Sequence, residues 1–269
     1  MTVSIICLAY NHAPYIRDAL DGFVKQQTDF PFEVLIHDDA SDDGTAEIIR
    51  EYAERYPDII RPVFQSVNQH SRGVRIARDF LFPLVRGRYV ALCEGDDYWT
   101  DPLKLSKQVA ALEACPEVDI CAHRALKMKN GRPHGHEGPG GRTRILPAGK
   151  VIMGGGGYVA TSSLMCRREL YLQDSPMRKI LFYDYTLQIQ GSLRGGMLYL
   201  SDCMSVYRRR VPGSWTAAHL HKGNSSHYRN FKLMLDALDE WTGGSLHKQI
   251  QARKRIYDVH SFFRKLLWK

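Results

Sequence analysis

The chain has 269 residues and a formal net charge of +8 at pH 7, with 44% hydrophobic and 25% charged residues. This length allows one substantial core, and the composition is that of an ordinary globular protein. Uncharged stretches are too short to span a bilayer and no basic patch precedes an apolar run at the start, so we expect neither a transmembrane helix nor a signal peptide.

The first half of the chain alternates strand and helix patterns. We expect strands at 3–8, 32–37, 59–64, 88–93 and 118–122, and helices at 14–27, 45–55, 73–85 and 102–114. Strands that alternate with helices of this length form parallel βαβ units with right-handed crossovers. The pattern therefore predicts an α/β fold.

The second half is less regular. The stretch 128–150 is rich in Gly, Pro, Arg and His, which indicates a mobile loop. Four glycines at 154–157 favour either a close backbone approach to a ligand or a hinge, and they lack the lysine of a P-loop. A helix at 184–194, a short strand at 197–200 and a basic turn at 207–210 follow.

The C-terminal tail carries most of the net charge. Residues 246–269 hold seven basic residues against one aspartate, a charge of +6, which leaves +2 for the other 245 residues. Helical spacing places an apolar stripe on one face of this tail. Such a helix either rests on an anionic membrane surface or docks its stripe on the domain. The stripe consists of Ala252, Ile256, Val259, Phe263, Leu266 and Leu267.

Six cysteines without any CxxC pair indicate a reduced, cytoplasmic protein and argue against a zinc site. The pairs His134/His136 and His219/His221 lie in polar, Gly- or Ser-rich surroundings without a third ligand nearby. We interpret them as solvated loop residues.

Three carboxylates follow the strand expected at 88–93. Glu94, Asp96 and Asp97 lie within four residues, and crowded carboxylates raise one another's pKa. A cation relieves that penalty, and oxygen ligands suit Mg²⁺ or Mn²⁺. The spacing therefore predicts a metal at the carboxyl end of a strand. The alternative is an acidic turn that caps the next helix, which explains Asp101 before Pro102 but not the other three.

Two further polar groups end neighbouring strands. Tyr10 and Asn11 follow the first strand, and Asp38 and Asp39 end the second. Parallel strands bring these groups to one edge of the sheet, where an aromatic ring beside a carboxylate stacks and reads a nucleobase. For Asp42, Asp43 and Thr45 we favour simple helix capping.

These motifs, in this order, resemble glycosyltransferase family 2. The resemblance rests on SIICLAYN at 4–11, DDASDDGT at 38–45 and GRYVALCEGDD at 87–97. The runs YDYTLQ at 183–188 and VYRR at 206–209 resemble the C-terminal signals of that family. The similarity covers about residues 3–215.

The resemblance implies a GT-A fold, a Rossmann-like, mostly parallel sheet flanked by helices. Residues 1–125 would form the nucleotide-sugar-binding half, 126–223 the acceptor-binding and catalytic half, and 224–269 an amphipathic helical tail. It also implies an inverting enzyme that transfers a sugar from a nucleoside-diphosphate donor, most commonly UDP-linked, to an acceptor hydroxyl. The expected setting is surface polysaccharide synthesis, such as O-antigen, lipopolysaccharide or capsule, on a lipid-linked glycan at the inner face of the plasma membrane.

By position, the resemblance assigns roles to several residues. Asp184 would be the general base, and Asp96 and Asp97, with Glu94 in place of the usual first aspartate, would hold the ribose and the Mn²⁺ or Mg²⁺ ion. Weaker candidates are arginines for the diphosphate, serines for the acceptor and tryptophans as sugar platforms, for which surface arginines and buried aromatics are the alternatives. The nucleotide-binding residues would be Ala9, Tyr10, Asn11, Asp38, Asp39, Arg72, Arg78 and Asp96, and the weaker set is Arg208, Arg209, Trp99, Ser162, Ser163 and Trp215.

Two other functions fit parts of the sequence. A nucleic-acid-binding protein would use the basic tail and would bind with a steep salt dependence. An inactive relative would bind the donor and act as a scaffold. The acidic cluster disfavours nucleic acid, which we therefore do not expect as a partner.

Overall fold

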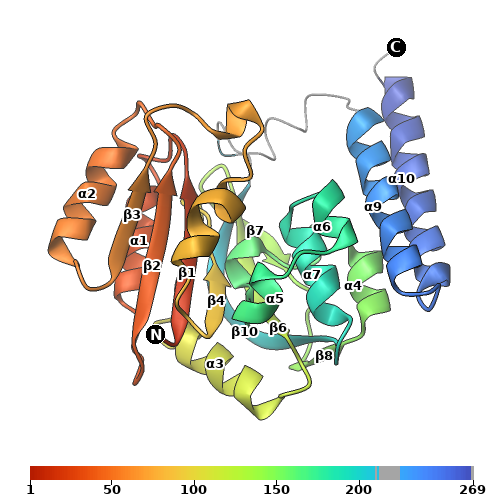
Figure 1. Cartoon of the computed structure of the whole chain (residues 1–269), viewed down its shortest axis with the longest axis horizontal. Coiled ribbons are helices and arrows are strands. Elements are labelled where there is room, and N and C mark those ends of the chain that lie inside the picture. Colours follow the sequence, from red (N-terminus) through yellow and green to blue (C-terminus); the bar gives the residue numbers. More distant parts are fainter. Residues whose placement is uncertain (210, 212–224, 268–269) are drawn as a thin grey trace.

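The computed structural model describes residues 1–209, 211 and 225–267. Within these residues, ten strands form one sheet in the order β3-β2-β1-β4-β9-β6-β10-β5, with β7 paired to β6 and β8 to β10. Helices flank this sheet, and a helical hairpin stands at the C-terminal side (Figure 1). The fold is α/β, as the alternating pattern predicts.

The first half forms the parallel part of the sheet, and most of its elements confirm the predicted ones. Strand β1 pairs in parallel with β2 and β4, and β2 pairs in parallel with β3. Their carboxyl ends therefore share one edge of the sheet. The strands are β1 (Val3–Ala9), β2 (Phe32–Asp38), β3 (Ile60–Phe64) and β4 (Tyr89–Leu92), and the helices are α1 (Ile16–Val24), α2 (Thr45–Arg55) and α3 (Lys104–Ala114).

The prediction of one regular helix at 73–85 is wrong. The chain forms three short turns there, η1 (His70–Arg72), η2 (Ala77–Leu81) and η3 (Phe82–Leu84). Pro83 lacks the N–H that an α-helix requires and its ring crowds the preceding turn.

The prediction of a loop at 128–150 is also wrong in part, because strands occupy much of this segment. Strand β6 (Ile120–Lys129) turns back into β7 (Arg132–Glu137), and β8 (Arg144–Leu146) pairs with β10. Asn130 and Gly131 have φ values of 51° and 72°, the positive values that a two-residue hairpin turn requires. The domain boundary expected at 125 falls inside β6.

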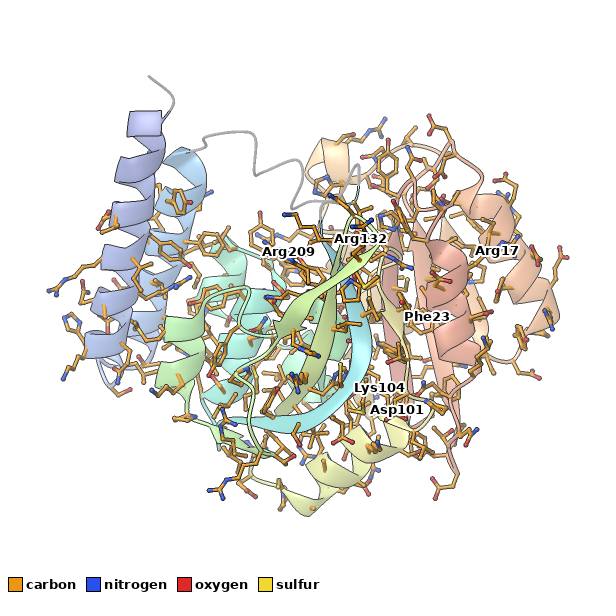
Figure 2. All side chains as sticks on the ribbon, turned by 180° about the vertical axis from the view of Figure 1, so that it is seen from behind. Arg17, Phe23, Asp101, Lys104, Arg132 and Arg209 are labelled. Atoms are coloured by element: carbon orange, nitrogen blue, oxygen red, sulfur yellow. The ribbon has the colours of Figure 1, made fainter. Side chains whose placement is uncertain are left out.

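Residues 207–209 of the basic turn expected at 207–210 instead end a long strand, β10 (Met197–Arg209), which pairs in parallel with β6, and Arg210 lies outside the described residues. Arg209 on β10 and Arg132 on β7 are labelled in Figure 2, which views the molecule from behind. The short strands β5 (Tyr98–Trp99) and β9 (Met165–Arg167) complete the sheet.

Two hydrophobic clusters fill the two sides of the sheet. One joins β1 and β2 to α1, α2 and α3, and the other packs the opposite face against the later helices. These later elements are α4 (Ala148–Gly154), η4 (Thr161–Ser163), α5 (Arg168–Leu172), α6 (Pro176–Ile180), α7 (Asp184–Ser192), α9 (Ser225–Trp241) and α10 (His247–Leu267).

The C-terminal helix docks on the domain, but with a different face from the predicted one. Ile250 and Tyr257 are buried in the core, whereas Val259 of the predicted stripe is 51% exposed. The side chains of Phe263, Leu266 and Leu267 lie outside the described residues. Ala252 and Ile256 are half-buried, so the predicted stripe is only partly buried in the part of α10 whose side chains the structure describes.

Part of the basic charge of the tail is neutralised within the hairpin. Lys232 pairs with Asp258 at 2.6 Å, and Lys254 pairs with Asp236. Among the described helices, none is long and apolar enough to cross a membrane.

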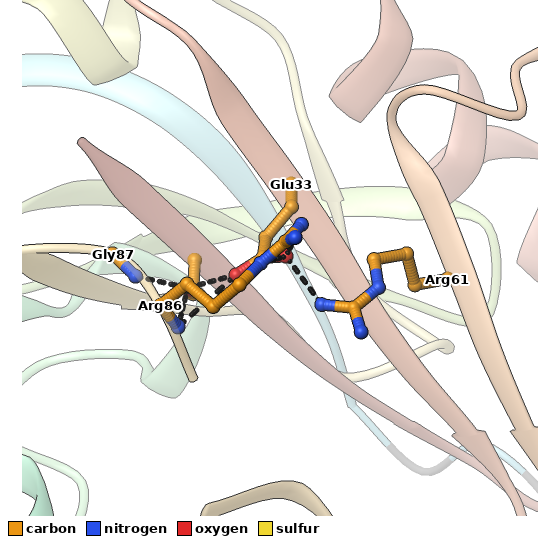
Figure 3. Close-up of polar contacts among 5 residues, drawn as sticks. Glu33, Arg61, Arg86 and Gly87 are labelled. Carbon is orange, nitrogen blue, oxygen red and sulfur yellow. Dashed lines mark hydrogen bonds and ion pairs between the residues drawn. The ribbon is translucent and has the colours of Figure 1, made fainter. Parts of the chain in front are cut away.

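A buried glutamate organises the amino-terminal edge of the sheet (Figure 3). Glu33 of β2 accepts hydrogen bonds from Ser4 Oγ and Arg61 Nη1, both at 2.7 Å, and from Arg86 Nε at 2.9 Å. Burial alone would raise the pKa of Glu33, but the hydrogen bonds from Arg86, Ser4 and Arg61 lower it below its usual value. This network ties β1, β2 and β3 to the entrance of β4, at the edge opposite the polar motifs.

Candidate active site

The loop at 94–97 connects β4 to β5 and presses against the end of β1. A Cβ atom on Gly95 would lie 2.8 Å from His12 Nδ1 and 2.8 Å from Ile16 Cδ1, so glycine permits this close approach. Both aspartates of the loop are buried, whereas Glu94 remains in contact with solvent.

Neighbouring carboxylates raise the pKa of Glu94 and of Asp97, as the spacing of this loop predicts. Desolvation, followed by the charges of Asp96 and Asp184, raises the pKa of Glu94 to about 8. Desolvation raises the pKa of Asp96, and desolvation followed by the charge of Asp96 raises that of Asp97 well above its usual value. Four carboxylates from two distant parts of the chain therefore share one electrostatic environment.

The aspartates of this loop fit a divalent cation whose remaining coordination comes from water and from the phosphates of a bound substrate. Asp97 Oδ2 is buried without a hydrogen-bond partner, although the nearby Ser162 hydroxyl helps to lower the Asp97 pKa. In the described part of the chain, no three His, Cys, Asp or Glu side chains are grouped to hold a metal by themselves. Mg²⁺ and similar ions commonly take one or two carboxylates and complete their shell with water and substrate phosphates. The crowded Asp96 and Asp97 suit that arrangement, and Glu94 does not complete a triad with them.

Arg208 supports the carboxylate loop. Its backbone N–H donates to Asp97 Oδ1 at 2.8 Å, and its Nη1 donates to the Asp96 carbonyl at 3.0 Å. The guanidinium also pairs with Asp18 and lies over the Tyr98 ring, 4.4 Å from its centre. These contacts hold the loop in place, so the Arg208 side chain is engaged with protein.

Asp184 begins α7 and is held by two hydrogen bonds. Thr161 Oγ1 donates to Asp184 Oδ2 at 2.8 Å, and the Tyr185 backbone N–H donates to Oδ1 at 2.7 Å. Burial raises the Asp184 pKa despite these hydrogen bonds. The charge of Asp184 raises the pKa of Glu94, so the two carboxylates lie near each other in the fold.

The Gly-rich segment at 154–157 lies between α7 and the C-terminal hairpin. A Cβ on Gly155, whose φ is +73°, would lie 1.9 Å from Arg253 Nη2, and Arg253 Nη1 donates to the Met153 carbonyl at 3.2 Å. Tyr185 Oη donates to the Ile152 carbonyl at 2.7 Å. The glycines allow close approach, but to a protein side chain of α10.

The loops after β1 and β2 are bonded to each other. The Asn11 backbone N–H donates to Ser41 Oγ at 2.9 Å, and Ser41 Oγ donates to Asp38 Oδ1 at 2.6 Å. Asn11 and Ala40 both have positive φ, 54° and 62°, an uncommon conformation that functional loops often hold. Ala9 is buried at the strand end, whereas Tyr10 is 41% exposed there.

Asp39 fastens a third loop to this edge. Its Oδ1 accepts from the Gln69 N–H at 2.8 Å and its Oδ2 from the His70 N–H at 3.0 Å. Each carboxylate oxygen has a second lone pair for a further hydrogen bond. Arg72, exposed in η1, is thereby brought to the site edge.

The capping interpretation of the acidic run after β2 holds for Asp43. Its Oδ1 accepts from the Thr45 N–H at 3.0 Å, and its Oδ2 accepts from the Ala13 N–H at 2.9 Å. This carboxylate serves the start of α2 and the turn before α1.

Three of the candidates are buried, and a fourth, Arg78, pairs with a neighbouring carboxylate. Trp99 is buried, donates to the Ser162 carbonyl at 2.9 Å and has Lys104 Nζ 3.8 Å from its ring centre, so it is a core residue and no sugar platform. Ser162 and Ser163 are fully buried and cannot meet an acceptor directly. Arg78 pairs with Asp174 at 3.1 Å, so its charge is already paired within the protein. Trp215 lies outside the described residues.

Sequence reasoning missed His12. It is buried between the loops, and its backbone N–H donates to Thr45 Oγ1 at 2.8 Å. Burial lowers its pKa, while the charges of Asp96, Asp43 and Asp38 oppose that shift. A single histidine after a strand does not indicate from sequence alone that its side chain will be buried beside the carboxylates. Its burial depends on the contact with Gly95, which is far from His12 in the chain.

Comparison with known proteins places residues 4–212 within the model of the family described as glycosyl transferase family 2. An uncharacterized protein of Mycobacterium tuberculosis is 40% identical over 218 residues, which cover 81% of this chain and 61% of the relative. The Escherichia coli enzyme WfaP, a UDP-Glc:α-D-GlcNAc-diphosphoundecaprenol β-1,3-glucosyltransferase, is 32% identical over 111 residues, 41% of each protein.

Solved structures share the fold. Staphylococcus aureus TarS in complex with UDP-GlcNAc has a TM-score of 0.65 at 20% identity, covering 89% of this chain and 67% of that one. The Pyrobaculum calidifontis mannosyltransferase in complex with GDP-Man and Mn²⁺ has a TM-score of 0.54 at 18% identity, covering 96% and 73%. The GT-A fold that the resemblance implies is thus confirmed.

Proposed function

Because this chain belongs to glycosyl transferase family 2, we propose that it transfers a sugar from a nucleoside-diphosphate donor to a hydroxyl of an acceptor, with inversion. The observation that carries the proposal is the gathering of four carboxylates with raised pKa values: desolvation raises all four, and the charges of neighbouring carboxylates add to the shift of Glu94 and Asp97. The four are Glu94, Asp96, Asp97 and Asp184. Sites that shift several carboxylates together are typical of catalytic centres.

The donor nucleotide would occupy the edge formed by the loops after β1, β2 and β4. Exposed Tyr10 would flank the base, Asp39 with Asp38 would accept its N–H, and Asp96 would bind the ribose. Arg72 is exposed on the loop that Asp39 holds, and its charge suits the diphosphate. We expect a UDP-linked sugar, since TarS was crystallised with UDP-GlcNAc and WfaP uses UDP-Glc by name.

Asp96 and Asp97 would hold Mn²⁺ or Mg²⁺ together with the donor phosphates. When bound, such an ion offsets negative charge on the departing diphosphate as a Lewis acid. The unpaired Asp97 Oδ2 and the Arg208 N–H on Oδ1 leave one oxygen of this carboxylate for the ion. The mannosyltransferase of the same fold was crystallised with Mn²⁺.

Asp184 would act as the general base. The acceptor oxygen forms a bond to the anomeric carbon, the bond from that carbon to the donor phosphate oxygen breaks, and the acceptor proton passes to Asp184. Burial favours the protonated carboxyl and so makes Asp184 a better proton acceptor. Thr161 and the Tyr185 N–H orient the carboxylate for this transfer.

The acceptor would be a glycan on a lipid carrier, in surface polysaccharide synthesis at the cytoplasmic membrane face. The WfaP acceptor is a diphosphoundecaprenol-linked sugar by name, which supports this class. The exposed Val259 beside basic residues of α10 suits a peripheral contact with anionic lipid. Sedimentation with anionic and neutral vesicles tests the contact, and equal sedimentation would contradict it.

A thermal-shift panel of nucleoside diphosphates and their sugars, with and without Mn²⁺, tests the donor proposal. A ligand that binds only the folded state raises the melting temperature by mass action, so the most stabilising compound identifies the donor. No metal-dependent shift with any nucleotide would contradict the proposal.

A further inference from the structure

A lysine lies in the core of the protein, where the proposed reaction does not use it directly. Lys104, labelled in Figure 2, begins α3 and is fully buried. Its Nζ donates to Gln108 Oε1 at 2.6 Å and lies 3.8 Å from the centre of the Trp99 ring. We call Lys104, Gln108 and Trp99 the lysine cluster.

The burial of this amine is costly. Desolvation lowers the pKa of Lys104 to about 7, and the thiols of Cys93 and Cys121 oppose that shift. Burial raises the pKa of both thiols, so neither carries a full negative charge at pH 7. An apolar side chain of similar length would avoid the desolvation of a polar group, so packing alone does not account for a lysine at this position.

The lysine cluster binds the short turn η4. Because Lys104 Nζ occupies Gln108 Oε1, the other end of the Gln108 amide is directed away and its Nε2 donates to the Ser163 carbonyl at 2.9 Å. The Trp99 indole N–H donates to the Ser162 carbonyl, also at 2.9 Å. Two successive carbonyls of η4 are therefore held by side chains of the lysine cluster.

The same turn contacts two carboxylates of the candidate active site. Thr161 Oγ1 donates to Asp184 Oδ2 at 2.8 Å, and the Ser162 hydroxyl lowers the pKa of Asp97 through a hydrogen bond. These two contacts come from adjacent residues of a single turn. A displacement of η4 therefore changes the surroundings of both carboxylates together.

We propose that Lys104 is a positioning residue for the transfer reaction. The lysine cluster holds η4, and η4 sets where Asp184 lies relative to Asp97. The inference rests on the proposed function, because it takes Asp184 as the base and Asp97 as a ligand of the metal. A misplacement of about 1 Å at a reacting group can cost about 10²-fold in rate, so a small shift of η4 is enough to slow the transfer.

Steady-state kinetics of Lys104→Met test the inference. Methionine keeps the length of the side chain and removes the amine. We expect kcat to fall at least about tenfold while the donor KM stays within about twofold of wild type, because the buried cluster acts on the placement of the base. The control Lys107→Met removes a lysine of the same helix that pairs with Asp101 and Asp202, and it should turn over like wild type. Equal kcat of Lys104→Met and wild type would overturn the inference.

A double-mutant cycle separates positioning from a general loosening of the fold. On the Asp184→Asn background, Lys104→Met should change kcat by less than about twofold, because the base that η4 positions is already absent. A loss on that background as large as in wild type would also overturn the inference. Trp99→Phe keeps an aromatic ring and loses the N–H that binds η4, so it should lower kcat in the same way even where Lys104→Met does not fold.

Hydrogen exchange tests the anchoring of η4 without turnover. The backbone N–H groups of Ser163 and Leu164 donate to the Ala160 and Thr161 carbonyls, at 2.9 and 3.0 Å. Both amides should exchange at least about tenfold faster in Lys104→Met or Trp99→Phe than in wild type. Unchanged exchange would contradict the inference even if kcat fell. If wild type transfers no sugar from any donor but exchange at η4 still rises in the variants, the proposed function fails and the anchoring of η4 by the lysine cluster stands.

Discussion

Glu94→Gln should stabilise the protein at neutral and alkaline pH in the absence of metal. The folded state raises the Glu94 pKa from 4.5 to about 8 through desolvation and the charges of Asp96 and Asp184. A raised carboxyl pKa means that the folded state binds the proton more tightly, so ionisation favours unfolding. Wild type therefore loses stability as the pH rises from about 4.5 to 8, and the neutral amide removes this loss.

The size of the effect follows from the pKa shift. By pH 7 about 2.5 pH units of that window have passed, which corresponds to a ceiling of about 3 kcal/mol at about 1.4 kcal/mol per unit. Because the Glu94 side chain meets solvent, screening reduces this to about 1 kcal/mol. For a domain of this size, that is a rise of about 2–4 °C in melting temperature.

Thermal unfolding of wild type and Glu94→Gln at pH 5, 7 and 8 in the presence of EDTA checks the prediction. The two proteins should melt together near pH 5 and diverge as the pH rises. Glu54→Gln, an exposed glutamate on α2, is the matched control and should show no such divergence. A difference that is independent of pH, or a variant that is less stable than wild type at pH 8, would refute the electrostatic reasoning.

Three further predictions address catalysis and the scaffold. Asp184→Asn should lower kcat about 10²–10⁴-fold with the donor-induced thermal shift unchanged, and turnover near wild type would remove it as the base. Glu33→Gln should lower the free energy of unfolding by about 1–3 kcal/mol in urea titrations at pH 7. Since the folded pKa of Glu33 is lowered, that deficit should shrink as the pH falls below the usual glutamate pKa, and a constant deficit would contradict the network's role. Gly155→Ala should cost about 1–3 kcal/mol from its positive φ and the contact with Arg253, and a double-mutant cycle with Arg253→Ala should be non-additive.

The carboxylate-bearing strand ends were predictable from the chain alone. Alternating strand and helix patterns predict β1, β2 and β4, and parallel strands necessarily place Asp38, Asp39 and Glu94 at one edge. The hairpin at Asn130 and Gly131 was predictable too, since Asn-Gly favours a two-residue turn, but the polar composition of 128–150 suggested a loop.

Burial and long-range contacts could be identified only from the folded structure and not from the sequence. The local sequence around Trp99 does not show that its ring packs on Lys104 or that its indole N–H donates to the Ser162 carbonyl. The local sequence around Gly155 likewise does not indicate the contact with Arg253, about a hundred residues later. The face of α10 that packs depends on the shape of the surface that receives it, which no helical period contains. Local patterns reflect the chain's own geometry and so determine the strands, the turns and the residues at strand ends. Whether a polar side chain meets solvent, another residue or a ligand depends on what the fold brings against it, and only the tertiary structure decides that.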